Sequence, residues 1–306
     1  MRIAYHASHE QFAPRAMLDL AVRAAGAGFD AIASSDHLAP WSDRRGVSGG
    51  AWPWLGAVLE RTGLPASVVT TPGWRYPPLV LAQSMATLAD LYPGRLTVTL
   101  GSGEALNERL VSDDWPAKPE RDRLLRERVE RIAGFLGGGA DGDARLYLVP
   151  EEPPVLSVAA VTVPTAGWIG GWWDRLTTVA DTIEATRDRV AAFRDARGDA
   201  GHVILKLQIS VDADRETAVT LAHREWGVAL VGAAELTELR TPAAFEAAAA
   251  ASVTREKVEG AIRPVTSRAE LEDALGAFAE LDPELLIVHD VAPAQRLIDL
   301  YAGGPS

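Results

Sequence analysis

Short apolar runs alternate with longer segments of helical periodicity along nearly the whole chain. Residues 2–7 form the first such run, and in residues 14–27 the apolar positions then fall on one side of a helix. Pro14 and Pro77 each stand at the start of a helical segment, where proline is favoured. We expect strands at 2–7, 29–34, 64–70, 95–100, 154–160, 175–179, 203–211 and 285–289. We expect helices at 14–27, 51–61, 77–92, 119–136, 181–197, 213–226 and 292–301, with two more within 230–258.

This order predicts an α/β fold, namely a (β/α)8 TIM barrel with eight parallel strands and a surrounding layer of helices. The long connections after the fourth and seventh strands are expected to hold insertions. Residues 137–144 are rich in Gly and Asp and are expected to form a loop. Neither a sequence repeat nor an interdomain linker interrupts the pattern, so we expect a single barrel domain over residues 1–306.

The amino-acid composition disfavours several classes of binding partner and excludes several kinds of chemistry. The 306 residues carry a formal net charge of −12 and the pI is about 5.0, so nucleic acid and anionic membranes are disfavoured partners. The chain has no cysteine, which excludes disulfides, thiolate catalysis and cysteine-ligated metals. We see no signal peptide and no apolar run near the ~20 residues of a membrane span. We therefore expect a cytoplasmic protein that acts on a small-molecule substrate.

Residues 101–108, GSGEALNE, carry the most suggestive chemistry. They follow the fourth expected strand, and active sites of parallel barrels are built at the carboxyl ends of the strands. Two glycines let backbone N–H groups approach a ligand, while Glu104 and Asn107 supply a carboxylate and an amide. A tight strand-to-helix turn explains the same residues equally well. Leu106 replaces the third glycine of a dinucleotide fingerprint, so the stretch does not match that motif.

A histidine closes the second expected strand. Asp36 and His37 stand at its end, and Trp41 follows closely. Imidazole exchanges protons readily near neutral pH, so His37 is a candidate acid or base, although a lone loop histidine is more often structural. Closure of a barrel would bring His37, Glu104 and Glu10 to the same mouth. This convergence favours a catalytic interpretation.

Other histidines and the tryptophans give weaker signals. His6 and His289 end the first and eighth strands and could also face the mouth, whereas His9 is expected to be exposed. No local ligand spacing supports a metal site among them, so no metal is predicted. Nine tryptophans are many for this length, and several follow strands in Gly- or Pro-rich loops, a placement typical of walls around a flat ligand. We expect Trp41 and Trp74 to form such walls.

Several motifs occur in an order and spacing that make chance similarity unlikely. They are residues 5–14 (YHASHEQFAP), 35–37 (SDH), 71–72 (TP), 75–76 (RY), 82–83 (AQ), 92–95 (YPGR), 101–108 and 115–116 (WP). With these motifs the chain resembles the luciferase-like flavin and deazaflavin oxidoreductases. Within that superfamily it is most similar to the F420-dependent glucose-6-phosphate dehydrogenase branch and to a subgroup thought to use an ordinary flavin. The resemblance is close over residues 1–130 and then rests on the order of elements.

The resemblance implies a barrel that holds an isoalloxazine or deazaflavin ring at its mouth. It implies that His37 is a catalytic base or stabilises the hydride-transfer intermediate, and that Glu104 is the proton donor or the partner of that donor. Trp41 and Glu10 would line the same site. The implied cofactor contacts are Asp36, Val68, Val69, Thr71, Gly103 and Asn107, with Val161 and Thr162 at the cofactor phosphate. At the end of the third strand the family can carry a strained cis peptide.

Three departures from the family pattern bear on function. Val161 and Thr162 replace a Gly-Gly pair that binds cofactor phosphate. No lysine matches those that would hold a sugar phosphate around residues 177–182, so a dianionic substrate such as glucose 6-phosphate is disfavoured. The segment 137–144 is shorter than the corresponding segment in relatives. We therefore expect a covering hairpin to be lost and the mouth of the barrel to be more open.

The sequence therefore predicts an FMN-dependent oxidoreductase or monooxygenase that acts on a small organic substrate. The alternative is hydride transfer with coenzyme F420. Two further hypotheses stay open at this point, a flavin-binding barrel without turnover and a flavin-free hydrolase or lyase that uses Glu104 and His37. Because relatives often pair, a homodimer is also considered.

Overall fold

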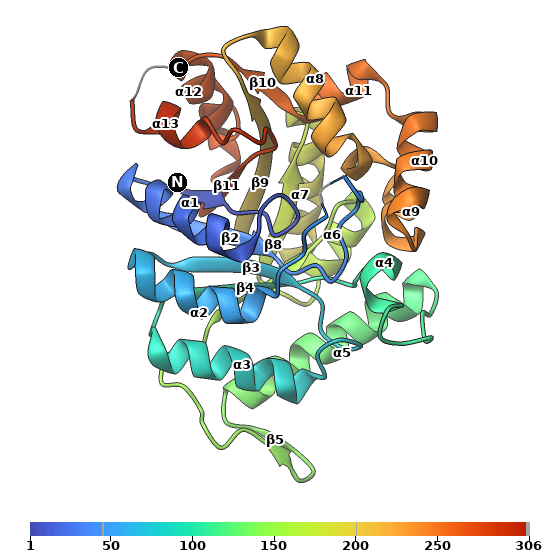
Figure 1. Ribbon diagram of the computed structural model, residues 1–306. Helices are drawn as coiled ribbons and strands as arrows, with labels where there is room; N and C mark the ends of the chain where they lie inside the picture. The colour runs from blue at the N-terminus through green and yellow to red at the C-terminus, as the bar shows by residue number, and fades with distance from the viewer. Residues whose placement is uncertain (45, 200, 304–306) are drawn as a thin grey trace.

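The computed structural model describes residues 1–44, 46–199 and 201–303. Within these ranges, eight parallel strands close a barrel (Figure 1) in the spatial order β9, β11, β1, β2, β3, β4, β7 and β8, with β8 pairing back to β9. The strands are β1 (Arg2–His6), β2 (Ala31–Ser35), β3 (Ala66–Thr70), β4 (Leu96–Leu100), β7 (Val155–Ala159), β8 (Arg175–Ala180), β9 (His202–Val211) and β11 (Leu285–Asp290). A short strand, β10 (Arg263–Val265), pairs with the carboxyl end of β9. The predicted (β/α)8 barrel is confirmed.

Helices pack around the outside of the strands (Figure 1). They are α1 (Pro14–Gly26), α2 (Ala51–Thr62), α3 (Pro78–Leu91), α4 (Ala105–Glu108), α5 (Lys118–Leu136), α6 (Val163–Gly170), α7 (Ile183–Arg197), α8 (Arg215–Trp226), α9 (Ala233–Glu238), α10 (Pro242–Ser252), α11 (Arg255–Ala261), α12 (Arg268–Gly276) and α13 (Leu297–Tyr301), with 3-10 turns η1 (Gly227–Leu230) and η2 (Ala279–Leu281). Side-chain oxygens of Thr162, Thr182, Asp214, Thr241, Thr254 and Ser267 cap six of these helices. No helix among the described residues is long and apolar enough to cross a bilayer.

Side chains alternate along each strand between the helix layer and the barrel interior. On β9, Leu205 and Leu207 belong to the large core beneath the helices, whereas Ile204 belongs to a separate interior cluster. That cluster also contains Ala4, Ala31, Ala33, Leu285 and Ile287. The residues that β1 and β2 contribute to this cluster are alanines, so the barrel centre has room for longer side chains from the opposite strands.

Four segments differ from the expected pattern. Residues 137–144 contain part of a hairpin, β5 (Ala140–Asp141) with β6 (Ala144–Arg145), so the expected loop is wrong, while the loss of a hairpin that covers the mouth stays a prediction. This hairpin lies between α5 and the amino end of β7, away from the mouth (Figure 1), so its length does not control access there. Residues 230–258 contain α9, α10 and the start of α11 rather than two helices, because Thr241 and Thr254 cap new helices within the Ala-rich run. Helices α6 and α12 were not predicted; glycines weaken the helical pattern of α6.

Candidate active site

One imidazole and two carboxylates meet beyond the carboxyl ends of β1, β2 and β4. His37 Nδ1 lies 3.7 Å from Glu10 Oε1 and 3.9 Å from Glu104 Oε2. The side chains of His37 and Glu104 are 12% and 20% exposed, while that of Glu10 is 3% exposed. The barrel therefore brings three predicted catalytic residues together and leaves two of them accessible. We call this set, with Trp41, the acid–base group.

Trp41 joins the group through two hydrogen bonds. Its backbone N–H donates to Glu10 Oε2 at 2.8 Å, and its indole Nε1–H donates to Glu104 Oε2 at 2.9 Å. The rings of Trp41 and His37 pack edge to face, with centroids 5.2 Å apart. Trp41 also stacks on Phe245 of α10, with centroids 6.3 Å apart. The insertion after β9 thus packs against the indole that bonds Glu104.

Asn107 positions the loop that carries His37. Its Oδ1 accepts hydrogen bonds from the backbone N–H groups of Leu38 and Ala39, at 2.7 and 3.0 Å. Its Nδ2 lies 3.3 Å from Glu104 Oε2 and 3.4 Å from His37 Nδ1. Asn107 therefore fixes the spacing between the imidazole and a carboxylate. The contact of Asn107 with a cofactor stays a prediction.

Burial controls the protonation of Glu104. It raises the pKa of this carboxyl, and the nearby Glu10 raises it further, while His37 and the indole of Trp41 act in the opposite direction. A carboxyl with a raised pKa retains its proton closer to neutral pH, which suits a proton donor. The imidazole of His37 lies beside both carboxylates. The group can therefore both donate and accept protons.

Asp36 points into a buried ion-pair network behind the acid–base group. Its Oδ2 accepts a hydrogen bond from Thr70 Oγ1 at 2.8 Å and lies 3.4 Å from Arg75 Nη1. Arg75 Nε donates to Glu108 Oε1 at 3.0 Å, and Arg75 Nη2 donates to the Asp36 carbonyl at 2.9 Å. These bonds connect the end of β2, the loop after β3 and α4. The predicted contact of Asp36 with a cofactor is untested, and in this structure its carboxylate is engaged with protein atoms.

The opposite side of the mouth is lined by small apolar residues. Val69, Ala159 and Val179 face the interior at the carboxyl ends of β3, β7 and β8, and each is only partly buried. An open surface of this kind fits a planar ring such as a flavin or a deazaflavin. The side chain of Val68 is buried in the helix-facing core, so Val68 could contact a ligand only through its backbone. None of the described peptide bonds is cis, so the strained peptide expected here is not found.

The remaining predicted cofactor residues lie beside this open side. Gly103 has φ of +83°, and a Cβ there would come within 2.9 Å of Thr71 Cγ2, so only glycine fits the loop against Thr71. Thr162 Oγ1 caps α6 by accepting a hydrogen bond from the N–H of Thr165 at 3.4 Å, and Val161 is 40% exposed. The start of α6 could face a phosphate, although Pro164 removes one N–H donor from its first turn. These cofactor contacts stay predictions.

The structure corrects the expected position of one histidine and shows two others inside the barrel. His9 is 1% exposed and packs on Trp54, with ring centroids 5.2 Å apart, so the expectation that it is exposed was wrong. Burial lowers the pKa of His9 to about 4. His6 and His289 face each other inside the barrel, with ring centroids 4.5 Å apart, and His289 Nε2 lies 2.8 Å from Gln11 Oε1. No group of three or more His, Asp or Glu residues in the described ranges could hold a metal ion.

A lysine was missed altogether. Lys206 lies on β9 and shares the inward side of the strand with Ile204, the member of the interior cluster. The alternation of apolar and polar residues in HVILKLQISV could have identified it, since one face of the strand reads Ile, Lys, Gln.

The tryptophans divide between the two ends of the barrel. Trp74 and Trp115 pack together with centroids 5.2 Å apart, and the guanidinium of Arg128 lies 4.3 Å from the Trp74 ring centre. The tryptophans at 168, 172 and 173 cluster at the end of α6, next to the amino end of β8. That second cluster does not line the mouth, contrary to expectation.

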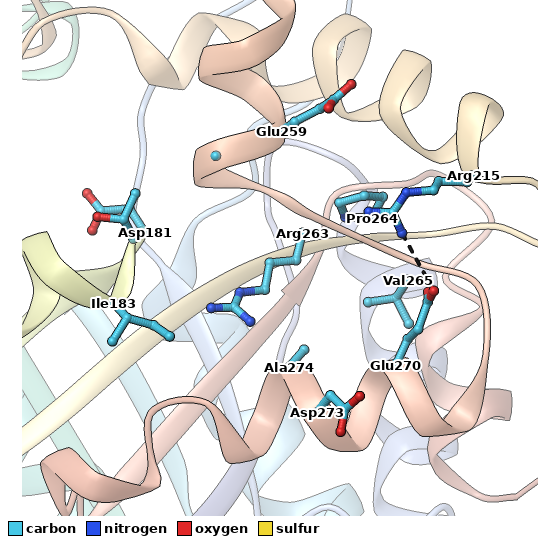
Figure 2. Close-up of a pocket in the computed structure, with 12 residues that line it drawn as sticks. Asp181, Ile183, Arg215, Glu259, Arg263, Pro264, Val265, Glu270, Asp273 and Ala274 are labelled. Carbon is cyan, nitrogen blue, oxygen red and sulfur yellow. Dashed lines mark ion pairs between the residues drawn. The ribbon is translucent and has the colours of Figure 1, made fainter.

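A pocket of about 470 Å³ lies beside β10, between the starts of α7 and α8 and the helices α11 and α12 (Figure 2). Arg263 projects into it (Figure 2). The Arg263 guanidinium also packs over the ring of Phe278, 5.1 Å from the ring centre. Arg215 Nη1 lies 3.6 Å from Glu270 Oε1 and is therefore partly neutralised. The charged residues that line the pocket are Asp181, Arg215, Glu259, Arg263, Glu270 and Asp273. Four carboxylates thus face two guanidinium groups.

Barrels with acid–base groups at the carboxyl ends of their strands occur in many enzyme classes, and sequence comparison identifies the class of this one. The luciferase-like monooxygenase family matches residues 1–289, and the chain belongs to this family. An F420-dependent glucose-6-phosphate dehydrogenase of Kribbella flavida is 38% identical over 239 residues, which cover 72% of each chain. A protein of the same name from Beutenbergia cavernae is 33% identical over 331 aligned positions, covering 99% of this chain and 95% of the relative.

Solved structures agree. An F420-dependent secondary alcohol dehydrogenase, determined with an F420–acetone adduct, is 28% identical and has a TM-score of 0.89, covering 99% of this chain and 98% of that one. The F420-dependent tetrahydromethanopterin reductase from Methanopyrus kandleri shares the fold, with a TM-score of 0.72 and 15% identity. The predicted family and oxidoreductase class are confirmed.

Proposed function

We propose that this protein is an F420-dependent dehydrogenase that transfers a hydride between the deazaflavin and a small neutral alcohol or its carbonyl product. The observation that carries the proposal is the imidazole of His37 held between Glu10 and Glu104 at the barrel mouth. The relatives described above are F420-dependent, which supports the alternative reading of the sequence better than the FMN-dependent monooxygenase first expected.

The residues present suggest how the cofactor would be held. Val69, Ala159 and Val179 would contact one face of the ring, and the start of α6 would face a phosphate group. When bound, the deazaflavin supplies the hydride acceptor or donor. The protein would supply alignment and proton transfer.

His37 would act as the base for the alcohol proton. Its Nδ1 faces the two carboxylates, so Nε2 is the nitrogen left for a substrate hydroxyl. The carboxylates of Glu10 and Glu104 would stabilise the imidazolium that forms. In the reverse direction the protonated His37 would return this proton to the carbonyl oxygen, and Glu104, with its raised pKa and 20% exposed side chain, would resupply His37 with protons from solvent. Trp41 would orient Glu104 and shield the reacting atoms from water.

The charges argue for a neutral substrate. Arg75 is already bonded to Asp36 and Glu108 and cannot serve a substrate anion. In the pocket of Figure 2, four carboxylates outnumber two guanidinium groups, which opposes a phosphate dianion. Oxygen-dependent chemistry with FMN is the second candidate, since Val161 and Thr162 replace the Gly-Gly pair that the deazaflavin branch uses for cofactor phosphate.

Cofactor titration followed by turnover tests the proposal. Apo protein is titrated with F420 and separately with FMN, and binding is followed by fluorescence quenching. Short secondary alcohols and glucose 6-phosphate are then tested without oxygen for reduction of F420. We expect tighter binding of F420, reduction by secondary alcohols and none by glucose 6-phosphate. Tighter binding of FMN together with oxygen-dependent substrate oxidation would overturn the proposal in favour of the second candidate.

A further inference from the structure

Lys206 lies inside the barrel, just below the mouth. It pairs in register with Ile287 of β11 and with Val179 of β8. The next inward position on β9 is Gln208, which is level with His289. Two residues of a strand rise roughly 7 Å, a height that an extended lysine side chain can span. The Lys206 ammonium can therefore approach the acid–base group from beneath.

No hydrogen bond or ion pair to a described residue explains why this ammonium is present. Within residues 1–44, 46–199 and 201–303, it makes no hydrogen bond and no ion pair within 4.0 Å. The chain has three lysines, and the other two lie on the surface: Lys118 pairs with Asp122 on α5, and Lys257 is exposed on α11. Arginine supplies the remaining 27 of the 30 basic residues. A titratable amine in the barrel interior is thus an exception in this protein.

Three ionisable groups interact electrostatically with Lys206: Glu10, Glu104 and His6. Glu10, after β1, and Glu104, before α4, favour its charged form, while burial opposes it and lowers the Lys206 pKa to about 8. His6 on β1 is adjacent, and burial followed by the charge of Lys206 holds the His6 pKa well below its usual range, so His6 is neutral. His289 on β11 packs against His6. The carboxylates are therefore the charges with which Lys206 interacts.

We propose that Lys206 is a positioning residue that balances the charge of the acid–base group. With Glu10 and Glu104 ionised and His37 protonated, the group alone carries a net charge of −1, and the ammonium makes the set neutral. An uncompensated negative charge at a partly buried site would be relieved by protonation of a carboxylate. Lys206 thus keeps both carboxylates available to stabilise a protonated His37. Only the kinetic part of this inference rests on the proposed function.

Lysine NMR on apo protein tests the coupling without turnover. With ¹³C placed selectively at lysine Cε, the chain gives three signals, which Lys→Arg variants assign. We expect Lys206 to titrate at least one pH unit below Lys118 and Lys257. Because coupling between sites is reciprocal, Glu10→Gln should lower the Lys206 pKa further and leave the two surface lysines unchanged. Titration of Lys206 together with the surface lysines, or no response to either Glu10→Gln or Glu104→Gln, would overturn the proposal.

Kinetics then test the consequence. In Lys206→Met the carboxylates should titrate at higher pH, so we expect the acidic limb of the kcat/KM profile to move up by about one pH unit. Lys206→Arg retains the charge and should restore the profile. An unmoved profile in folded Lys206→Met would contradict the inference even where F420 turnover is established. If F420 turnover is absent, the proposed function fails while the NMR titration still decides the role of Lys206. If Lys206→Met does not fold, the Glu10→Gln titration decides alone.

Discussion

The indole of Trp41 donates a hydrogen bond to Oε2 of Glu104 at 2.9 Å. Trp41 belongs to the loop after β2, and Glu104 immediately precedes α4. Trp41 is in turn stacked on Phe245 of α10, within the insertion that follows β9. Through this contact, an element outside the barrel orients a carboxylate at its mouth and favours the ionised form of that carboxylate against the effect of burial.

Removing the indole donor should shift the pH dependence of the reaction. In Trp41→Phe the ring can still stack on Phe245, but the hydrogen bond that stabilises ionised Glu104 is lost. The Glu104 pKa should therefore rise further, and we expect the limb of the kcat/KM profile that reports this carboxyl to move up by about one pH unit. Trp74→Phe is the matched control, since the indole N–H of Trp74 donates no hydrogen bond to any described residue. Identical profiles for the wild type and Trp41→Phe would exclude this role for the indole.

Loss of the imidazole should slow turnover and spare cofactor binding. His37→Ala removes the proposed base, and a positioned base typically contributes about 10²–10⁴-fold to rate, so kcat should fall by that factor. The dissociation constant of F420, measured by fluorescence, should change only a few fold. His223→Ala on the exposed face of α8 controls for loss of a histidine as such. A decrease in kcat of less than tenfold would remove His37 from the role of base.

The buried guanidinium of Arg75 should stabilise the fold. Its side chain is 7% exposed and neutralises Asp36 and Glu108, which are 2% and 0% exposed. Arg75→Met would leave two buried carboxylates without a counter-charge, and we expect a loss of about 3–5 kcal/mol in the free energy of unfolding in urea. Arg255→Met, which breaks an exposed pair with Glu216, should cost at most about 1 kcal/mol. Equal losses in the two variants would contradict the importance of the buried network.

The sequence predicted the residues of the acid–base group better than their surroundings. Glu10, His37 and Glu104 each follow a strand, and closure of a parallel barrel necessarily brings strand ends together. His9 also follows a strand, but the packing of Trp54 from α2 buries it, and no local pattern encodes that contact.

Helix boundaries also depend on packing that the local sequence does not encode. The Ala-rich run 230–258 has helical periodicity throughout, and its division depends on caps whose effect is decided by packing. The single domain over residues 1–306, the homodimer and the cytoplasmic location stay predictions.

The burial of His9 should make the fold sensitive to acid. Its pKa is about 4 in the native state, because burial disfavours the imidazolium, and about 6.5 in an unfolded chain. The unfolded chain therefore binds a proton first as the pH falls. The contribution of His9 to stability is complete above pH 6.5 and is lost between pH 6.5 and 4, amounting to about 3 kcal/mol.

Urea unfolding of the wild type and His9→Leu at pH 7.5 and pH 4.5 would measure this contribution. Leucine keeps an apolar contact with Trp54 and cannot titrate, so the variant should lose less stability on acidification than the wild type. Other groups that titrate in this range, including the buried His6, are common to both proteins and cancel in the difference. Because linkage fixes the sign, a variant that loses as much stability as the wild type would mean that His9 takes up its proton equally easily in both states.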